Sequence, residues 1–477
     1  MKILLTVHQF FPDHRSGTEV LTLAVAKELQ RRGHDVRVLT GFPNRPPVPD
    51  AERLDGYDVE GVRVFRFSHG HRPVGDQTTI TEIEYGNRLA AGYFARLVAM
   101  FAPDIVHFFH FNRLGAALVD VAVKSGTAAY YTPTDFWSVC QTAQLMLPDG
   151  GACSGPSKHS GNCVKHVAAL TQGRAVGQLI RYVPDAVADL AVKLTADGAL
   201  PSYPLSHEIA ALHRRKDFLV TRLNWLHGIV SPTAVMTDIL VRNGVDRDLI
   251  VQSGYGIETP GGEAAVATLG EAEPLNVGYI GTLAPHKGCH VLIDAFRRIA
   301  PGKARLKIYG NPADFPHYYA DLLRRAAGSP AITFCGTFPN HEIGEILSGL
   351  HVLVVPSLWY ENAPLVMHAA LAAKRPVIAS HLPGLSETVK DCWNGLLFPA
   401  GSVNALHDRL ARLLGNRSLL TTLSRNCYKP KTTAAYVDEL LALYAKGPLR
   451  DMRKRDYHGL QDIQPVDAGW VPLPDVR

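Results

Sequence analysis

Short runs rich in β-branched and aromatic residues alternate with helical patterns along almost the whole chain, and this alternation constrains the fold more than any other feature. It is typical of parallel sheets whose successive strands are joined by crossover helices. In the first half, the spacing of apolar residues predicts a helix over residues 18–32 that ends at Gly33. The predicted strands around this helix cover residues 2–7, 35–40, 62–67, 104–109 and 128–132.

A second series of strands begins in the sequence near Gly228. We expect it to form a second sheet, because residues 167–226 are helical in pattern and contain no strand. A last helix is predicted over residues 434–444, and the proline-rich tail 447–477 is expected to be loosely held. The predicted strands of the second sheet cover residues 228–232, 275–280, 306–309, 332–335, 352–355 and 376–379.

The composition indicates a globular enzyme of two or three domains, with 477 residues of which 46% are hydrophobic and 19% charged. The formal net charge of +5 is too small to argue for a nucleic-acid partner, but it is compatible with an anionic ligand or with peripheral association at the inner face of a membrane. No apolar run is long enough to span a bilayer and no signal peptide is recognisable, so we expect a cytoplasmic protein. Seven cysteines, an odd number, argue against a secreted disulfide framework.

The segment LNVGYIGTLAPHKGCHVLIDAF runs from a strand through a glycine and a loop into a helix. Its loop carries Lys287 and Gly288 just before the helix. A helix N-terminus offers unpaired N–H groups and a partial positive charge, and a lysine beside it adds a full one, so this geometry favours a diphosphate. The alternative is a surface lysine at a tight strand-to-helix turn.

A second informative strand end is VLVVPSLWYENAPLVMHAALA, in which Glu361 follows a buried strand and Pro364 is placed to begin a helix. Ligands of open α/β sheets bind outside the carboxyl ends of the strands, which is where this carboxylate is expected. The alternative is that Glu361 only interacts favourably with the helix dipole.

Taken together, four segments resemble the donor domain of the retaining glycosyltransferases of family 4, which have the GT-B fold. The segments are GTLAPHKG, LKIYG, TFCGTFP and PSLWYENAPLVMHAALA, and their order and spacing agree with that family. TVHQFFPDHRSGTEVLTLAVAKELQRRGHDVRVLT and PDIVHFFH resemble its opening unit and its fourth-strand histidine segment. The resemblance covers about residues 1–445 and is strongest over 275–380.

The resemblance implies an α/β protein with two Rossmann-like domains whose parallel sheets face each other across a cleft that holds the active site. It implies an N-terminal acceptor domain over residues 1–228, with a cysteine-rich loop at 140–166, and a C-terminal nucleotide-sugar donor domain over residues 229–430. Residues 431–477 would form a C-terminal helix that returns to the N-terminal domain, followed by the tail.

The implied function is retaining transfer of a hexosyl-type sugar from a UDP- or GDP-sugar to a hydroxyl of a carbohydrate or glycolipid acceptor, without a catalytic metal and without nucleic acid. This places the protein in glycan, polysaccharide or glycoconjugate biosynthesis. The implied catalytic residues are Glu361, Lys287 and His110. The implied donor-binding residues are Gly17, Thr18, Gly281, Thr282, Gly310, Phe338, Asn362, Ala363, Pro364 and Leu365.

Two positions depart from the family pattern. The second glutamate of the acidic signature falls on Ala369, which cannot accept a hydrogen bond from a ribose hydroxyl, and Thr282 stands where many relatives carry an arginine. These departures keep two alternatives open: a non-catalytic sugar-nucleotide-binding or scaffold relative, and a nucleotide-sugar epimerase on the same fold.

A separate signal lies in a loop rich in glycine and proline. Cys140, Cys153, Cys163 and His166 are four soft ligands, and the last two are separated by only two residues, as in many metal clips. In a reducing compartment they suit a tetrahedral, structural zinc ion, because four protein ligands leave no open position. Free thiols or one disulfide are the alternatives.

Overall fold

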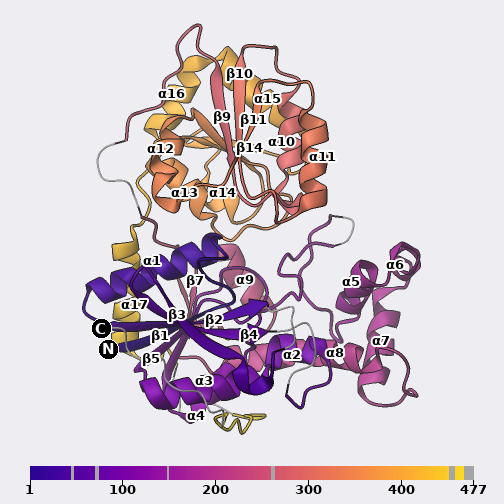
Figure 1. Ribbon diagram of the computed structural model, residues 1–477. Coiled ribbons are helices and arrows are strands. Elements are labelled where there is room, and N and C mark those ends of the chain that lie inside the picture. The colour runs from indigo at the N-terminus through magenta and orange to yellow at the C-terminus, as the bar shows by residue number, and fades with distance from the viewer. Residues whose placement is uncertain (44–47, 70–74, 148–149, 259–263, 451–456, 467–477) are drawn as a thin grey trace. The chain divides into compact units, whose positions relative to one another are not determined.

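The computed structural model describes residues 1–43, 48–69, 75–147, 150–258, 264–450 and 457–466 (Figure 1). The chain divides into two compact units, each built around its own sheet. The first unit comprises residues 1–232, 236–253 and 437–477, and the second comprises 233–235 and 254–436. The predicted α/β class with two parallel sheets is therefore confirmed.

The first sheet has eight strands in the order β3-β4-β2-β1-β5-β6-β7-β8. All neighbours are parallel except β3 and β4, which form an antiparallel hairpin at one edge. The strands are β1 (Lys2–Val7), β2 (Asp35–Pro43), β3 (Leu54–Val59), β4 (Val62–His69), β5 (Ile105–Phe108), β6 (Ala128–Tyr131), β7 (Gly228–Ser231) and β8 (Ile250–Gln252).

Ten α-helices of the described chain accompany the first sheet, and three of them, α5 to α7, project away from it in Figure 1. They are α1 (Gly17–Arg31), α2 (Ile80–Gly86), α3 (Arg88–Phe101), α4 (Leu118–Lys124), α5 (Gly161–Thr171), α6 (Arg174–Arg181), α7 (Asp185–Ala196), α8 (Ser206–Leu223), α9 (Ala234–Arg242) and α17 (Thr433–Lys446). Short 3₁₀ turns lie at Asp50–Glu52 and Arg247–Leu249.

The second sheet has six parallel strands in the order β11-β10-β9-β12-β13-β14. They are β9 (Leu275–Ile280), β10 (Ala304–Tyr309), β11 (Ile332–Gly336), β12 (Val352–Val355), β13 (Val377–Ser380) and β14 (Gly395–Phe398). The helices are α10 (Cys289–Phe296), α11 (Pro316–Ala326), α12 (Ile343–Ser348), α13 (Leu365–Ala372), α14 (Leu385–Thr388), α15 (Val403–Gly415) and α16 (Arg417–Arg425), with 3₁₀ turns at Pro285–Lys287 and Asn340–Glu342. Apolar side chains from β9, β10 and α10 dominate the core on one face, and those from α13 line the core on the other, while successive residues of β12 and β13 point alternately into the two cores.

The boundary expected near Gly228 is wrong. β7 pairs in parallel with β6 and so extends the first sheet, and the chain leaves the first unit only after Ser253. The long helical segment from α5 to α8 separates β6 from β7 in sequence, which made β7 look like the start of a new sheet. Parallel strands tolerate crossovers of any greater length, so the separation does not prevent pairing.

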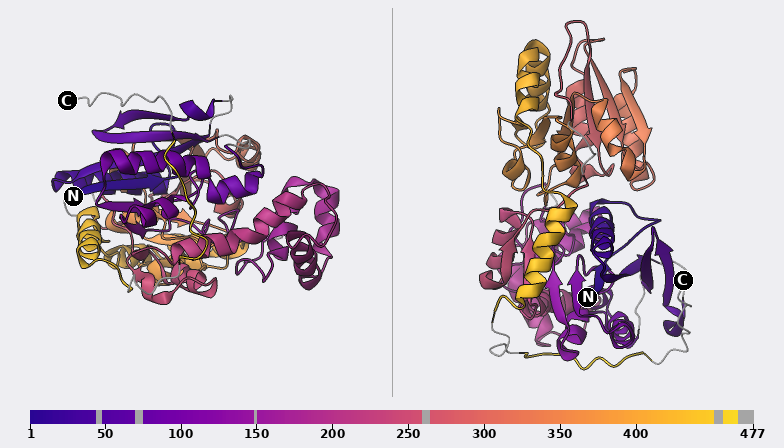
Figure 2. Two further views of the ribbon diagram at one scale, coloured as in Figure 1. Left: turned by 90° about the horizontal axis from the view of Figure 1, so that it is seen from below. Right: turned by 90° about the vertical axis from the view of Figure 1, so that its left-hand side faces the viewer.

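The C-terminal segment is packed rather than loosely held over the residues that the structure describes. Residues 437–477 belong to the first unit. There the hydroxyl of Tyr444, on α17 (gold in Figure 2), is hydrogen-bonded to Nδ1 of His107 at 2.6 Å. Further on, the N–H of Gln461 donates to Asp120 and the N–H of Val466 donates to the carbonyl of Gly92. Proline-rich composition did not reveal this, because these contacts use backbone groups that any sequence supplies.

Candidate functional site

The second sheet places two loops at its topological switch point. Successive strands run from β9 through β10 to β11 on one side and from β12 through β13 to β14 on the other, so β9 and β12 are the neighbours at which the strand order reverses. The loops that follow these two strands diverge there, and ligands of open α/β sheets bind in the resulting crevice. Lys287 follows β9 and Glu361 follows β12.

Lys287 and Glu361 form an ion pair. Lys287 Nζ lies 2.8 Å from Glu361 Oε1 and 3.0 Å from Oε2. Glu361 is buried, and its Oε1 also accepts hydrogen bonds from Ser357 Oγ and, at 2.9 Å, from Trp359 Nε1. Lys287 Nζ lies 4.8 Å from the centre of the Trp359 ring. Both predicted catalytic residues of this unit are therefore held in one polar cluster.

Backbone contacts between the two loops fix this cluster. The N–H of Leu358 donates to the carbonyl of His286 at 2.8 Å, which ties the loop after β12 to the loop after β9. Gly288 has φ of +72°, and a Cβ there would lie 1.9 Å from the carbonyl oxygen of Pro356. A Cβ on Gly384 would lie 1.8 Å from the carbonyl oxygen of Glu361. Only glycine permits these approaches.

The segment between Glu361 and α13 is also held in place. Asn362 Oδ1 accepts from Thr233 Oγ1 at 3.0 Å, and its Nδ2 donates to the hydroxyl of Tyr255 at 3.1 Å. Ala363 adopts a left-handed conformation with φ of +54°, which is uncommon for a residue with a side chain and is typical of functional loops. Pro364 precedes α13, and its carbonyl accepts from the N–H of Met367, so the free N–H groups at the start of the helix are those of Leu365 and Val366, which follow this loop directly.

Other predicted donor-binding residues lie at neighbouring strand ends. The N–H of Gly281 donates to the carbonyl of Tyr309, and a Cβ on Gly310 would lie 2.4 Å from the carbonyl oxygen of Gly281. Phe338 packs edge-on against Tyr309 with ring centroids 5.5 Å apart. The carbonyl of Thr282 accepts from the hydroxyl of Tyr279. These residues therefore lie just after the carboxyl ends of β9, β10 and β11.

His368 precedes Ala369, the position that lacks the carboxylate of the family pattern, but it does not supply a charge in place of that carboxylate. Burial lowers the pKa of His368 to about 4, so its ring is neutral at pH 7. Its Nε2 is buried and has no hydrogen-bond partner among the described residues.

The first sheet has its own switch point, between β1 and β5, and a second polar cluster lies there. His110 follows β5, and its Nε2 lies 3.0 Å from Asp135 Oδ2. The His110 ring also packs against His8, which follows β1, with ring centroids 4.2 Å apart. His8 Nε2 lies 3.7 Å from Glu19 Oε1 on α1. His107, by contrast, is wholly buried between Tyr444 and Thr132 and serves the core.

Burial shapes the charges of this second cluster. Burial raises the pKa of Glu19 to about 7, although the N–H of Ser16 donates to its Oε2 at 2.6 Å. Burial, together with the charges of His110 and Arg113, holds the pKa of His8 well below its usual range. Glu19 Oε1, His8 Nδ1 and Arg113 Nη1 are buried and have no hydrogen-bond partner among the described residues. Gly17 and Thr18 open α1 beside this cluster.

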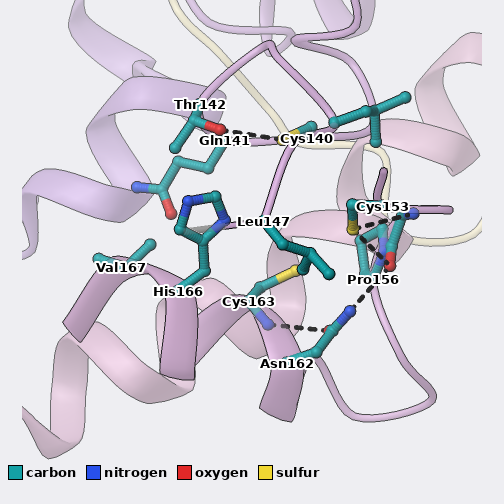
Figure 3. A pocket seen from close by; sticks show the side chains of 12 residues that line it. Cys140, Gln141, Thr142, Leu147, Cys153, Pro156, Asn162, Cys163, His166 and Val167 are labelled. Carbon is teal, nitrogen blue, oxygen red and sulfur yellow. Dashed lines mark hydrogen bonds between the residues drawn. The ribbon is translucent and has the colours of Figure 1, made fainter. Parts of the chain in front are cut away.

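The four predicted zinc ligands line one small pocket of about 20 Å³, room for about one water molecule (Figure 3). Cys163 and His166 come from α5, and Cys140 and Cys153 come from the loop after β6. Burial raises the pKa of the Cys163 thiol to about 12. Within the described parts of the chain, however, no group of three or more His, Cys, Asp or Glu side chains is arranged to hold a metal ion as it stands.

Sequence reasoning missed several members of these clusters. Ser357 and Trp359 hold Glu361, and Gly384 makes room for its backbone. Of the first-unit cluster, Glu19 could have been found, because Ser16 followed three residues later by a glutamate is a helix N-terminal capping pattern. Gly384 carries no local signal, because its role depends on a contact 23 positions away in sequence.

With this geometry established, comparisons with known families agree on one class. Residues 16–256 match the family described as glycosyl transferase 4-like domain, and residues 274–416 match glycosyl transferases group 1. The chain therefore belongs to the group 1, or family 4, glycosyltransferases and has their GT-B fold.

Individual relatives match less than half of this chain, at moderate sequence identity. The chain is 32% identical over 186 residues to alpha-maltose-1-phosphate synthase of Mycolicibacterium smegmatis, covering 37% of this chain and 46% of that protein. It is 30% identical over 238 residues to D-inositol 3-phosphate glycosyltransferase of Stackebrandtia nassauensis, covering 45% and 53%. The chain thus spans about half the length of these relatives. HepE of Anabaena, crystallised with UDP-glucose, is similar in fold with a TM-score of 0.55 at 13% identity, covering 94% of this chain and 98% of HepE.

Proposed function

We propose that the protein is a glycosyltransferase that moves a sugar from a nucleotide-sugar donor to an acceptor hydroxyl with retention of anomeric configuration. The observation that carries this proposal is the Lys287–Glu361 ion pair at the switch point of the second sheet, in a chain that belongs to a glycosyltransferase family. We propose this activity for the chain itself, and with it a place in glycan, polysaccharide or glycoconjugate biosynthesis.

In this proposal the second unit stabilises the leaving diphosphate. As the bond between the anomeric carbon and the phosphate oxygen breaks, negative charge grows on that oxygen. Lys287 supplies a full positive charge, and the free N–H groups at the start of α13 supply partial ones, so the charge is stabilised without a catalytic metal. Gly281, Thr282 and Gly310 would line the approach of the phosphates, and Phe338 that of the base.

Glu361 has two roles in this proposal. It holds the Lys287 ammonium in place in the free protein, and it meets hydroxyls of the donor sugar when the donor draws Lys287 towards its phosphates. Its Oε1 already accepts from three donors, which argues for a positioning and binding role and against a covalent nucleophile. Asn362, Ala363, Pro364 and Leu365 would complete the sugar and phosphate contacts.

On the first unit, we assign His110 to the acceptor or transferred sugar. Asp135 accepts from one ring nitrogen of His110, and the N–H of Asn112 donates to the other, so the ring orientation is fixed from both sides. Gly17 and Thr18 begin α1 beside this cluster, where the helix N-terminus favours an anionic donor group.

A donor panel tests the proposal and separates it from the alternatives. UDP-glucose is the first donor to try, because HepE was crystallised with it, and GDP-sugars are the second. Transfer to an acceptor, or slow donor hydrolysis, is expected with one nucleotide. Binding without turnover would favour the non-catalytic relative, and conversion of the donor into its sugar epimer would favour the epimerase.

We also propose a structural zinc ion in the cysteine pocket. Three observations support it: Cys140, Cys153, Cys163 and His166 line one pocket, the N–H of Gly155 donates to Cys153 Sγ at 3.4 Å, and the buried Arg215 lies close enough for Cys140 and Cys163 to stabilise its charge. A zinc ion with three thiolates and one neutral imidazole carries a net charge of −1, which the Arg215 guanidinium would balance. The four ligands would have to close around the ion.

Elemental analysis tests this zinc. Protein purified without a chelator is expected to hold one zinc per chain, and the Cys153→Ser, Cys163→Ser double variant is expected to hold none. Cys335→Ser is the matched control, because Cys335 is a partly exposed cysteine of the second unit. Absence of zinc in the wild-type protein, or full zinc in the double variant, would remove the proposal.

A further inference from the structure

Half of the large hydrophobic side chains that are exposed in the described chain fall within 36 residues. Sixteen such side chains are exposed, and eight of them lie between residues 170 and 205, in the segment formed by α5, α6, α7 and the loop to α8. We call this segment the helical insert. Its exposed members are Leu170, Leu179, Tyr182, Val187, Leu190, Leu200, Tyr203 and Leu205.

The helical insert has almost no core of its own. Val192 is the one large apolar side chain that is fully buried on α5, α6 and α7 among those that the structure describes. The three helices pack against one another, and they reach the rest of the first unit through α8 and through the loop after β6, which shares a pocket with α5 (Figures 1 and 2). α8 itself is firmly anchored, because Arg222 forms a buried two-bond ion pair with Asp120. The insert is thus an apolar protrusion on a fixed base.

α6 concentrates this exposure on one face. Leu179 and Tyr182, the residue that follows α6, are 73% and 88% exposed, and residues three apart lie on the same side of a helix. Arg181 is exposed and makes no ion pair within the described part of the chain, and it points about 100° away from Tyr182 around the helix, at the flank of this face. An apolar residue and a tyrosine on one face, with a long arginine at its flank, are typical of a helix that lies in a membrane interface, where the ring and the charged group reach the headgroup level.

The charges of the insert favour an anionic surface. Residues 161–205 carry four lysines and arginines and three aspartates, a net charge of +1. The aspartates are already engaged: Asp185 pairs with Lys165 at 2.8 Å, Asp197 pairs with Lys193, and Asp189 accepts from Ser157 Oγ and the N–H of Gly161. α6 contains no acidic residue. The positive charge that remains therefore lies on the helix with the most exposed apolar face.

We infer that the helical insert docks on an anionic lipid membrane, with Leu179 and Tyr182 entering the interface and Arg181 meeting phosphate headgroups. Among the described residues no helix is long and apolar enough to cross a bilayer, so the contact would be peripheral. This inference does not depend on the donor chemistry proposed above. A protein held at a membrane in this way would have direct access to an acceptor anchored in lipid.

Vesicle co-sedimentation tests the inference. The full chain is expected to bind phosphatidylcholine vesicles that contain 30% phosphatidylglycerol, at least about tenfold more strongly than pure phosphatidylcholine vesicles. The Leu179→Ser, Tyr182→Ser double variant is expected to lose at least about tenfold of this binding, because it removes two apolar side chains from the interface. Arg181→Gln is expected to weaken binding and to reduce its sensitivity to salt.

The matched control is the Trp393→Ser, Tyr428→Ser double variant, which removes two exposed aromatic side chains from the second unit, 59% and 44% exposed. It is expected to bind vesicles like the wild type. Thermal unfolding of each variant checks that the fold is intact. Equal binding to neutral and anionic vesicles, or equal loss in the control, would overturn the inference. So would a dimer in light scattering that the Leu179→Ser, Tyr182→Ser variant dissociates, because the occupant of the face would then be a second copy.

Discussion

At the scale of single residues, the two switch-point clusters differ in how their charges are satisfied. In the second unit, the Glu361 carboxylate meets an ammonium, a hydroxyl and an indole N–H, so its charge is matched even though it is buried. In the first unit, Glu19 Oε1 has no hydrogen-bond partner within the described residues, and its nearest basic group is a neutral histidine. Burial therefore favours the protonated form of the Glu19 carboxyl, whereas the negative charge of Glu361 is matched by its partners.

The first prediction concerns the matched pair. Lys287→Ala and Glu361→Gln are each expected to lower turnover by at least roughly tenfold, about 1.4 kcal/mol of barrier. In the proposed reaction Lys287 stabilises the donor diphosphate, and Glu361 holds Lys287 in place and binds the donor sugar. Steady-state kinetics with the active donor measures this. Lys303→Ala, which alters an exposed lysine of the same unit, is the control and should leave turnover unchanged. Wild-type rates in both site variants would show that the chemistry lies elsewhere.

The second prediction concerns the unmatched carboxyl, Glu19. Its pKa is about 7 in the folded protein and about 4.5 when exposed, so the folded state holds an extra proton between these values and stability falls as pH rises through this window. Glu19→Gln removes that proton equilibrium. The stability of the wild type relative to this variant should therefore fall between pH 5 and pH 7.5, by roughly 2 kcal/mol.

Urea unfolding at the two pH values measures this difference. Glu28→Gln on the same helix is the control, because pairing with Arg31 lowers the pKa of Glu28 to about 2. Glu28 is then ionised in both the folded and the unfolded protein throughout the window, so this variant should show no such pH dependence relative to the wild type. A parallel pH response of wild type and Glu19→Gln would contradict the predicted protonation.

At the scale of elements, the sequence predicted the buried strands well and the edge strands poorly. β1, β9 and β12 have the predicted bounds, because each is a run of buried apolar residues. β3 was missed, since LDGYDV combines a glycine with two aspartates and is held at the sheet edge by its hairpin partner β4. β14 was missed although it is as long and as buried as β12, because its first residue follows Asn394 in an Asn-Gly pair that is typical of a turn.

The candidate site shows the same division between local and distant information. Lys287 and Glu361 each follow a recognisable strand, so the sequence could indicate them separately. Their direct contact, and the support from Ser357 and Trp359, depend on how the loops after β9 and β12 meet. The set of four zinc ligands remains a prediction. The residues chosen from their spacing in the sequence line one pocket, but sharing a pocket does not establish how close the ligand atoms come to one another.

The third prediction tests the loop contact at Gly384, between β13 and α14. Gly384 has φ of +85°, and an added Cβ would lie 1.8 Å from the carbonyl oxygen of Glu361. Gly384→Ala is therefore expected to displace Glu361 and to lower turnover at least roughly tenfold. Kinetics and thermal unfolding on the same samples measure the loss of activity against the loss of stability.

Gly328→Ala separates backbone strain from this clash. Gly328 has a similar φ of +78°, but an added Cβ there would meet no atom within 4 Å. It should lose about 1 kcal/mol of stability and keep its turnover. If the two alanine variants lose turnover equally, strain rather than the displacement of Glu361 explains the effect.

At the scale of the whole molecule, the chain holds two cores that are built separately. The second unit is formed almost entirely from one continuous stretch, residues 254–436, whereas the first recruits residues 437–477 from the far end of the chain. α17 begins in the second unit and ends in the first, where Tyr444 packs against Tyr130 and His107. Each unit thus has its own buried apolar surface, and we expect each to open as a cooperative unit of its own.

The last prediction follows from these separate cores. A nucleotide that binds the second unit stabilises only states in which that unit is folded, by RT ln(1 + [L]/Kd). With UDP or GDP at a hundred times its Kd, amide hydrogen exchange through global opening of the second unit should slow by roughly a hundredfold. Exchange in residues 34–131 of the first sheet should change little.

Hydrogen exchange followed by mass spectrometry measures both units in one sample. Lys287→Ala is the control, because the loss of the ammonium should remove most of the slowing at the same nucleotide concentration, when exchange is compared with that of the same variant without nucleotide. Equal slowing in both units would mean that they open as one. Slowing confined to residues 34–131 would place the nucleotide in the first unit, and would contradict the donor role assigned to the loops after β9 and β12.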